Sequence, residues 1–239
     1  MLSPKQKLER PMGTVAAPPR PPIGTLSSSY SSLRFGGKIG VSVRVNARSS
    51  ASSSATGEEF LPNARRRKID PTWCGGGFSL GVDLGASRTG LALGKGYSPR
   101  PLIVLALTGQ KLELRLLDIA EKEEVDEFII GLPKSHDGKE TAQSNKVRSI
   151  AGRLAVRAAE RGWRVFLQDE HGTSLDALDY MIDMGLKRSA RQGKIDAYSA
   201  MMVLERYFSM SGLGTELVLP KQLELHEKLR KGPCRDLDF

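Results

Sequence analysis

Cysteine is scarce in this 239-residue sequence, which contains only Cys74 and Cys234. Both lie outside the segment that carries the chain's motifs, so neither a disulfide framework nor a cysteine-based zinc site is indicated, and we expect free thiols. No apolar run approaches the length of about 18 residues that a membrane-spanning helix requires. The apolar core of a secretory signal is also missing. The sequence therefore predicts neither a membrane span nor a secreted protein.

Acidic residues are almost absent from the N-terminal region, where Glu9 is followed by none until Glu58. The same region is rich in Ser, Pro and Arg, a composition typical of organellar transit peptides. We predict a transit peptide and disordered linker over residues 1–77, with cleavage between Val45 and Asn63. A chloroplast location (stroma or nucleoid) is favoured over the mitochondrion because serine dominates. A disordered basic tail of a nuclear or cytosolic protein is the alternative.

The positive charge is concentrated in the same N-terminal region. The formal net charge is +9, and residues 1–78 hold 12 Lys and Arg against 4 Asp and Glu. The remainder holds 24 basic and 23 acidic residues. The high net charge therefore gives no evidence that the folded part binds nucleic acid.

Hydrophobic periodicity predicts an α/β domain over residues 78–210, followed by a tail over 211–239 that carries no evident chemistry beyond a short polar helix. The first three strands have no room for helices between them, so they predict an antiparallel meander, and the later strands are joined by helices. The result is a mixed sheet with helices packed on it. Thr173 or Ser174 is expected to cap the third helix, and 186–194 is expected to be a basic loop. Strands are expected at 79–83, 89–93, 102–107, 125–130 and 164–167, and helices at 112–124, 141–161, 175–184 and 195–210.

Three acidic residues stand where these elements end or begin. Asp83 ends the first strand, Glu170 follows the last one, and Asp196 opens the last helix on the same face as its apolar residues. If they converge at one sheet edge, their mutual repulsion requires a compensating cation. Mg²⁺ or Mn²⁺ suits oxygen ligands, and two such ions about 4 Å apart can activate water and stabilise the leaving oxygen of a phosphodiester. This pattern favours a nuclease.

Four motifs in order resemble the YqgF/RuvX family, over about residues 78–210. They are Asp83-Leu84-Gly85 with Arg88 and Gly90, Ile130-Gly131-Leu132-Pro133 with Asp137-Gly138, Asp169-Glu170 with Thr173-Ser174, and Lys194-Ile195-Asp196 with Ala200. The resemblance implies a ribonuclease H-like fold, and members are described as Holliday-junction resolvases or pre-16S rRNA nucleases. It also implies that Asp83, Glu170 and Asp196 are the catalytic, metal-binding acids.

The resemblance has one departure, because the family usually has Arg after Asp-Glu and this chain has His171. A histidine cannot reproduce the bidentate fork of arginine, so the roles of His171 and Asp169 are left open. The change is either tolerated, or accompanied by a loss of nuclease activity, or gives His171 a chemical role of its own. The candidate contacts to nucleic acid are Arg88, Lys134, Lys139, Lys146, Lys187, Arg188, Arg191 and Lys194.

The sequence thus predicts a metal-dependent endonuclease of the plastid that processes the 5′ end of pre-16S rRNA. A Holliday-junction resolvase acting on four-way DNA and a binding module that has lost catalysis are the alternatives. An actin-like ATPase also uses Asp-x-Gly but needs two lobes, for which the domain is too short. Nucleic acid is the expected partner, with no membrane contact. A ribosomal precursor particle and a homodimer are left open as further partners.

Overall fold

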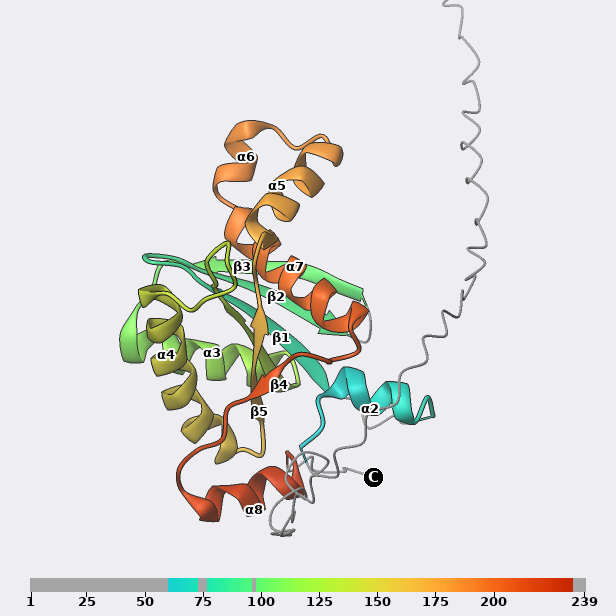
Figure 1. The fold of residues 1–239 in the computed structure, drawn as a ribbon, viewed down its shortest axis with the longest axis vertical. Helices are drawn as coiled ribbons and strands as arrows, with labels where there is room; N and C mark the ends of the chain where they lie inside the picture. The colour runs from blue at the N-terminus through green and yellow to red at the C-terminus, as the bar shows by residue number, and fades with distance from the viewer. Residues whose placement is uncertain (1–59, 73–76, 96–97, 234–239) are drawn as a thin grey trace, which may run out of the picture. The chain divides into compact units, whose positions relative to one another are not determined.

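The computed structural model describes residues 60–72, 77–95 and 98–233, and its strands form one sheet (Figure 1). The strands are β1 (Phe78–Leu84), β2 (Thr89–Lys95), β3 (Ser98–Leu105), β4 (Val125–Leu132), β5 (Arg164–Asp169) and β6 (Glu216–Leu217). The helices are α2 (Asn63–Ile69), α3 (Gly109–Lys122), α4 (Ala142–Ala159), α5 (Thr173–Asp183), α6 (Arg188–Gln192), α7 (Ile195–Ser209) and α8 (Leu223–Lys231).

The sheet has the predicted mixed topology, with strand order β3-β2-β1-β4-β5-β6. Strands β1, β2 and β3 are antiparallel neighbours, while β4 runs parallel to β1 and β5 runs parallel to β4. The two-residue strand β6, which the sequence patterns did not predict, pairs antiparallel with β5. An antiparallel meander followed by parallel crossovers is therefore confirmed.

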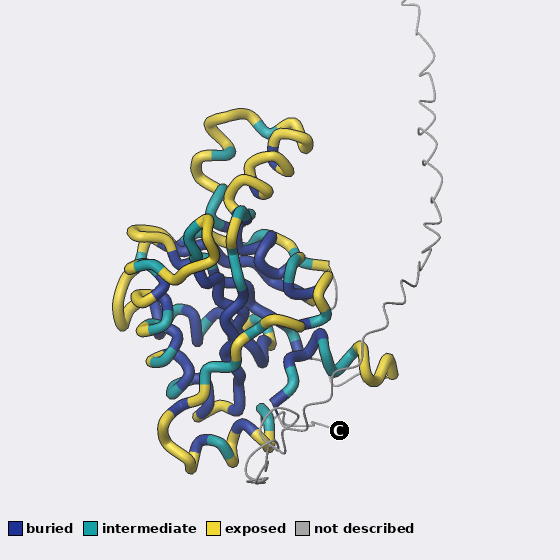
Figure 2. The backbone as a smooth tube through the Cα atoms, viewed as in Figure 1, coloured by how far each residue is buried: buried dark blue, intermediate teal, exposed yellow. Residues whose placement is uncertain are grey.

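The alternation of β1 divides the core into two layers. Leu80, Val82 and Leu84 are buried in the cluster that the sheet forms with α3 and α4. The opposite face is covered by α7, and a β-carbon at Gly81 would lie 2.7 Å from the carbonyl oxygen of Ala200. Because strand residues alternate between faces, Asp83 shares the α7 face with Gly81. Figure 2 shows the buried strands between these helical layers, while α5 and α6 are largely exposed.

Helix α7 fits the predicted apolar face. Ala200, Val203, Leu204 and Tyr207 are all fully buried. Their spacing of three to four residues places them on one side of the helix, against the sheet. This packing fixes the first turn of α7, which contains Asp196, against β2.

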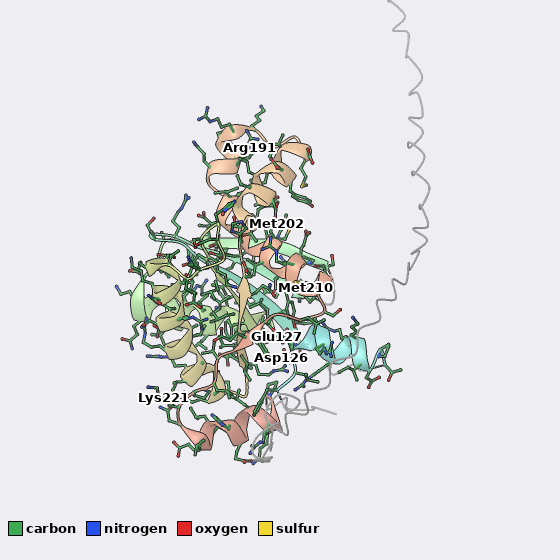
Figure 3. All side chains as sticks on the ribbon, viewed as in Figure 1. Asp126, Glu127, Arg191, Met202, Met210 and Lys221 are labelled. Carbon is green, nitrogen blue, oxygen red and sulfur yellow. The ribbon has the colours of Figure 1, made fainter. Side chains whose placement is uncertain are left out.

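The disorder predicted for the whole linker is wrong, because α2 forms within the residues assigned to it. The backbone N–H of Asn63 donates to Oε2 of Glu127 at 2.9 Å, and that of Ala64 donates to the Tyr207 hydroxyl at 2.9 Å. Asn63 and Ala64 are fully buried. Figure 3 shows Asp126 and Glu127 beside α2. Sequence periodicity missed this helix because its partners lie more than 60 residues away.

The short helix expected in the tail after residue 210 is α8, and it packs against residues that precede the predicted domain. Phe60 packs with Leu225 and Leu229 of α8 in a separate buried cluster, so α8 is amphipathic rather than merely polar. The predicted transit peptide up to residue 59, together with Cys74 and Cys234, lies outside the described residues. In the described ranges, no helix combines the length and the apolar character that crossing a membrane requires.

Candidate active site

Asp83 lies one residue before the end of β1, on the face covered by α7. Its partner across the antiparallel ladder is Gly90 of β2. A β-carbon at Gly90 would lie 1.8 Å from the backbone carbonyl oxygen of Asp196. The glycine thus lets the first turn of α7 lie directly on the sheet, and this contact brings Asp196 next to Asp83.

Glu170 reaches the other side of Asp83 from the end of β5. Its backbone N–H donates to the Leu132 carbonyl at 3.3 Å, which continues the parallel ladder by one residue. A β-carbon at Gly131 of β4 would lie 1.9 Å from Oε2 of Glu170. The absence of a side chain at Gly131 therefore leaves the space that the Glu170 carboxylate occupies.

The two glycines flank Asp83 across three adjacent strands. Val82 is in register with Ile130, so Gly131 is the next residue of β4 beside Asp83. Asp196 lies over the β2 side and Glu170 over the β4 side of the same sheet face. The structure thus brings the three predicted acids together at one edge of the sheet, where Asp83 interacts electrostatically with both Asp196 and Glu170. Helices α5 and α6 project beyond the sheet in Figure 1 and are called the arm below.

The electrostatics of this edge are those of closely placed, partly desolvated acids. Burial raises the pKa of Asp83 to about 6, with a further contribution from the charge of Asp196. Burial also raises the pKa of Glu170 to about 8, supported by the charges of Asp83 and Asp169 and opposed by Arg206. Asp83 is therefore the acid that interacts with both of the others, and negative charge at this edge is stabilised by a cation.

Two carboxylate oxygens at this edge are buried without a hydrogen-bond partner: Oε2 of Glu170 and Oδ2 of Asp196. The latter atom lies 2.9 Å from Nε of Arg88 in an ion pair. Buried oxygens without donors are unfavourable unless a cation contacts them. This donor set fits Mg²⁺ or Mn²⁺, which prefer carboxylate oxygens.

The described residues do not form a complete metal cage. Within 60–72, 77–95 and 98–233, no three His, Cys, Asp or Glu side chains are grouped closely enough to ligate one ion. Mg²⁺ commonly uses only one or two carboxylates and completes its shell with water and substrate phosphates. The arrangement therefore fits ions that are held jointly by this edge and a bound phosphodiester.

Asp169, whose role the sequence left open, is engaged in the adjacent turn. Its carboxylate accepts from the backbone N–H of His171 at 2.8 Å and lies 3.0 Å from Nζ of Lys134. Although burial raises the pKa of Asp169, these two donors bring it below its ordinary value. The His171 ring is exposed and packs edge to face with that of His136 at 6.2 Å. Asp169 thus shapes the turn, whereas Glu170 faces Asp83.

The loop after β4 lies beside this turn, and two of its lysines are paired with carboxylates. Lys134 is paired with Asp169, and the exposed Lys139 is paired with Asp137 at 2.9 Å. Lys146, on α4, is exposed. Lys134 and Lys139 would therefore have to leave these carboxylates before they could contact a phosphate.

Of the remaining predicted basic residues, Lys187, Arg188 and Arg191 lie in or next to α6 of the arm. The expected loop over 186–194 contains the short helix α6, which shows Lys187 and Arg188 exposed and Arg191 partly exposed. Lys194, also exposed, directly precedes α7. Figure 3 shows Arg191 on the arm, away from the sheet.

The start of α5 also differs from its prediction. Helix α5 is capped by Gly172 in a left-handed conformation (φ 81°), not by Thr173 or Ser174. The Thr173 hydroxyl instead donates back to the Glu170 carbonyl at 2.9 Å. The turn between β5 and α5 is therefore closed by backbone geometry and by a hydrogen bond within the turn.

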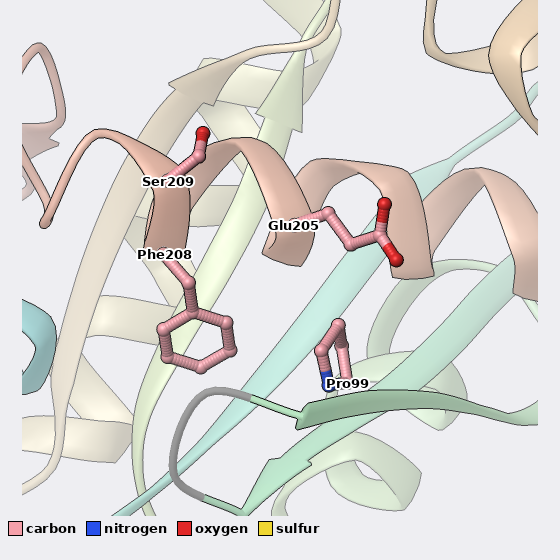
Figure 4. A pocket seen from close by; sticks show the side chains of 4 residues that line it. All are labelled: Pro99, Glu205, Phe208 and Ser209. Atoms are coloured by element: carbon pink, nitrogen blue, oxygen red, sulfur yellow. The ribbon is translucent and has the colours of Figure 1, made fainter. Parts of the chain in front are cut away.

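The roles of three residues at this site could not be predicted from the sequence. Gly90 and Gly131 belong to the motifs named above, but their steric roles against Asp196 and Glu170 depend on the fold. Arg206, on α7, donates to the Asp169 carbonyl at 3.1 Å and had no local signal. A hollow of about 420 Å³ lined by Pro99, Glu205, Phe208 and Ser209 contains none of the predicted site residues (Figure 4).

Comparison with known proteins identifies the family of this chain. Residues 77–210 match RuvX, described as Holliday junction resolvase. A protein of Nitratidesulfovibrio vulgaris named "Putative pre-16S rRNA nuclease" is 33% identical over 135 residues, covering 55% of this chain and 92% of the relative. One of the same name from Shewanella oneidensis is 31% identical over 132 residues, covering 54% of this chain and 92% of the relative.

Among solved structures, T. thermophilus RuvC in complex with Holliday junction substrate is 18% identical with a TM-score of 0.41, covering 59% of this chain and 99% of that one. Because the RuvX match spans more than half of the sequence, the chain belongs to the RuvX family of Holliday junction resolvases.

Proposed function

We propose that this chain is a metal-dependent endonuclease that hydrolyses phosphodiester bonds at the edge formed by Asp83, Glu170 and Asp196. The observation that carries the proposal is Oε2 of Glu170, a buried carboxylate oxygen without a hydrogen-bond donor, next to Asp83. A structural hydrogen-bond network would satisfy such an atom, as the Arg88 guanidinium does for Oδ2 of Asp196 at 2.9 Å. The unsatisfied Glu170 oxygen supports the binding of a cation at this edge.

Divalent ions bound at this edge would supply a water of lowered pKa and charge stabilisation for the leaving oxygen. The chain's own residues then have distinct roles. Asp83, Glu170 and Asp196 would hold the ions through their carboxylate oxygens. Arg88, paired with Asp196 at 2.9 Å and about half exposed, can hold that carboxylate and contact a phosphate.

For the substrate, we propose the 5′ region of the small-subunit ribosomal RNA precursor. The relatives named for pre-16S rRNA support this choice over a four-way DNA junction. The exposed basic residues Lys187, Arg188 and Lys194 would contact the backbone of the nucleic acid beside the acids. A ribosomal precursor particle would add contacts that the nearly neutral folded part does not supply.

The test is cleavage of end-labelled pre-16S rRNA 5′ fragments and, in parallel, of synthetic four-way DNA junctions. The full-length chain is incubated with Mg²⁺, with Mn²⁺ or with EDTA. The matched control is Asp83→Asn, which removes one negative charge and keeps the shape of the side chain. Cutting of RNA that requires metal and that is absent from Asp83→Asn is the expected result.

Other outcomes separate the alternatives. Metal-dependent cutting of the junction alone would replace the RNA substrate by four-way DNA. Tight binding of either substrate without cutting would identify a binding module. Cutting that persists in EDTA or in Asp83→Asn would contradict the proposed site.

We further propose that the protein acts in the chloroplast. The proposal is supported by the acid-poor, Ser- and Arg-rich composition of residues 1–57. A fusion of residues 1–77 to a fluorescent protein should accumulate in the stroma or nucleoids. Accumulation in the mitochondrion, or a diffuse distribution, would contradict it.

A further inference from the structure

The resemblance to the family leads us to expect an arginine at position 171, where this chain has His171. His171 is exposed, and its backbone N–H, rather than its ring, donates to the Asp169 carboxylate at 2.8 Å. Its ring packs against His136. No guanidinium reaches the Asp169-Glu170 turn from position 171.

An arginine reaches this turn from a different element. Arg206 lies in the last turn of α7, with 28% of its side chain exposed. Its Nη1 donates to the Asp169 carbonyl at 3.1 Å, and its Nη2 lies 3.5 Å from Oδ2 of Asp176 in the first turn of α5. The guanidinium thus links the end of β5 to the start of α5, with Glu170 between its two contacts.

The other contacts of the turn come from its own residues, from β4 and from the loop after β4. Strand β6 pairs only with Phe166 and Leu167, so it does not extend to Asp169. The Glu170 N–H donates to Leu132, Thr173 donates to the Glu170 carbonyl through its N–H and its hydroxyl, and the Asp169 carboxylate is held by the His171 N–H and by Lys134. Arg206 adds a charged donor from a helix that is itself fixed on the sheet.

We propose that Arg206 is a positioning residue that takes the place of the family's arginine at 171. Its fork holds the Asp169 carbonyl and the Asp176 carboxylate, and this fixes the direction in which the Glu170 carboxylate points. Its positive charge also offsets the clustered acids around Glu170. The inference rests on the proposed nuclease function.

The first test is a kinetic rescue with the full-length chain and the RNA substrate. Arg206→Ala should lower kcat about tenfold or more while KM changes little, because a charged hydrogen bond that orients a catalytic group is lost. Arg206→Lys should restore part of kcat, since it returns the charge without the fork. Adding His171→Arg to Arg206→Ala should restore most of it. Arg115→Ala on α3, an exposed arginine paired with Asp118, is the control and should be unchanged.

The rescue separates positioning from simple stabilisation. An arginine returned at position 171, on another element, cannot rebuild the packing of α7, so a purely structural role would not be rescued. Unchanged kcat in Arg206→Ala, or a loss that His171→Arg does not reverse, would overturn the inference.

The second test does not require activity. Hydrogen exchange at the amides of Glu170, His171 and Thr173 should become faster in Arg206→Ala, slow again when His171→Arg is added, and stay unchanged in Arg115→Ala. If the unsubstituted chain fails to cleave, the proposed function fails, and this exchange pattern still decides the role of Arg206. Unchanged exchange at all three amides would overturn it.

Discussion

Gly131 and Glu170 fit together so closely that a β-carbon on the glycine would lie 1.9 Å from the glutamate's Oε2. They come from adjacent parallel strands and are brought together by the ladder between β4 and β5. The vacant side-chain position on β4 therefore determines where the most strongly perturbed carboxylate of the site can lie.

Gly131→Ala should displace the Glu170 carboxylate and leave the sheet intact. Because a displacement of about 1 Å can lower catalysis about a hundredfold, we expect a loss of cleavage of that order with the circular dichroism spectrum unchanged. The control is Gly152→Ala on α4, where a β-carbon would meet nothing within 4 Å. That variant should keep full activity and gain about 0.5 to 1 kcal/mol of stability. Equal activity of the two variants would contradict the steric role of Gly131.

The raised pKa of Glu170 predicts that the metal-free protein loses stability as pH rises. Its pKa is about 8 in the folded protein against an ordinary value of 4.5, so between these values the folded state binds more protons than the unfolded state. The free energy of unfolding should therefore fall between pH 5 and pH 8. Glu170→Gln should remove much of this fall, on the order of 3 kcal/mol, less than the full shift would give because the carboxyl group is only partly buried. Urea denaturation in EDTA at pH 5, 6.5 and 8 measures it. If the free energy of unfolding falls equally with pH in the unsubstituted protein and in Glu170→Gln, the raised pKa of Glu170 is refuted.

Metal binding should show the opposite pH dependence. Asp83, with a pKa of about 6, and Glu170, with a pKa of about 8, must lose protons before they ligate an ion. The affinity for Mn²⁺ should rise by about tenfold or more from pH 6 to pH 8, with protons released on binding. Calorimetry in two buffers of different ionisation enthalpy measures both quantities. Asp83→Asn serves as the control and should bind more weakly with fewer protons released.

Helix α2 should be required for stability although it precedes the matched family domain. It supplies the N–H of Asn63 to the buried Glu127, whose pKa is raised by burial despite the opposing charge of Arg164. A chain starting at residue 78 should be less stable than one starting at residue 60 by about 3 kcal/mol or more, because buried charged groups lose their donors. Urea midpoints of the two chains decide this. If the N-terminal region is cleaved as a transit peptide, the cut must then fall before Phe60.

The basic arm should contribute to the salt dependence of nucleic-acid binding. Replacing Lys187, Arg188 and Arg191 with Ala should lower the slope of log K against log salt concentration by about two, as expected when three phosphate contacts are lost. The control removes three exposed lysines in and near α8, Lys221, Lys228 and Lys231, and changes the net charge equally. Titration of labelled RNA at several salt concentrations distinguishes a local contact from a net-charge effect. Equal slopes for the two triple variants would exclude the arm as a contact surface.

The sequence by itself determined the main strands and helices, apart from α2, α6 and β6, and the positions of the acids along them. Strand β1 and helix α7 were predicted within one or two residues, because their apolar periods of two and 3.6 are local properties. The same periods placed Asp83 near a strand end and Asp196 in the first turn of a helix. The mixed sheet followed from the lengths of the connections between strands.

Only the tertiary structure decided which residues meet. Gly131 touches Glu170, Asn63 donates to Glu127, and Arg206 reaches Asp169, yet each pair is separated by more than 30 residues and leaves no local pattern. Such contacts depend on strand register and on the seating of α7 against the sheet. Periodicity records which face of an element is apolar, whereas steric fit and hydrogen-bond satisfaction select the partners that the opposing elements bring to it.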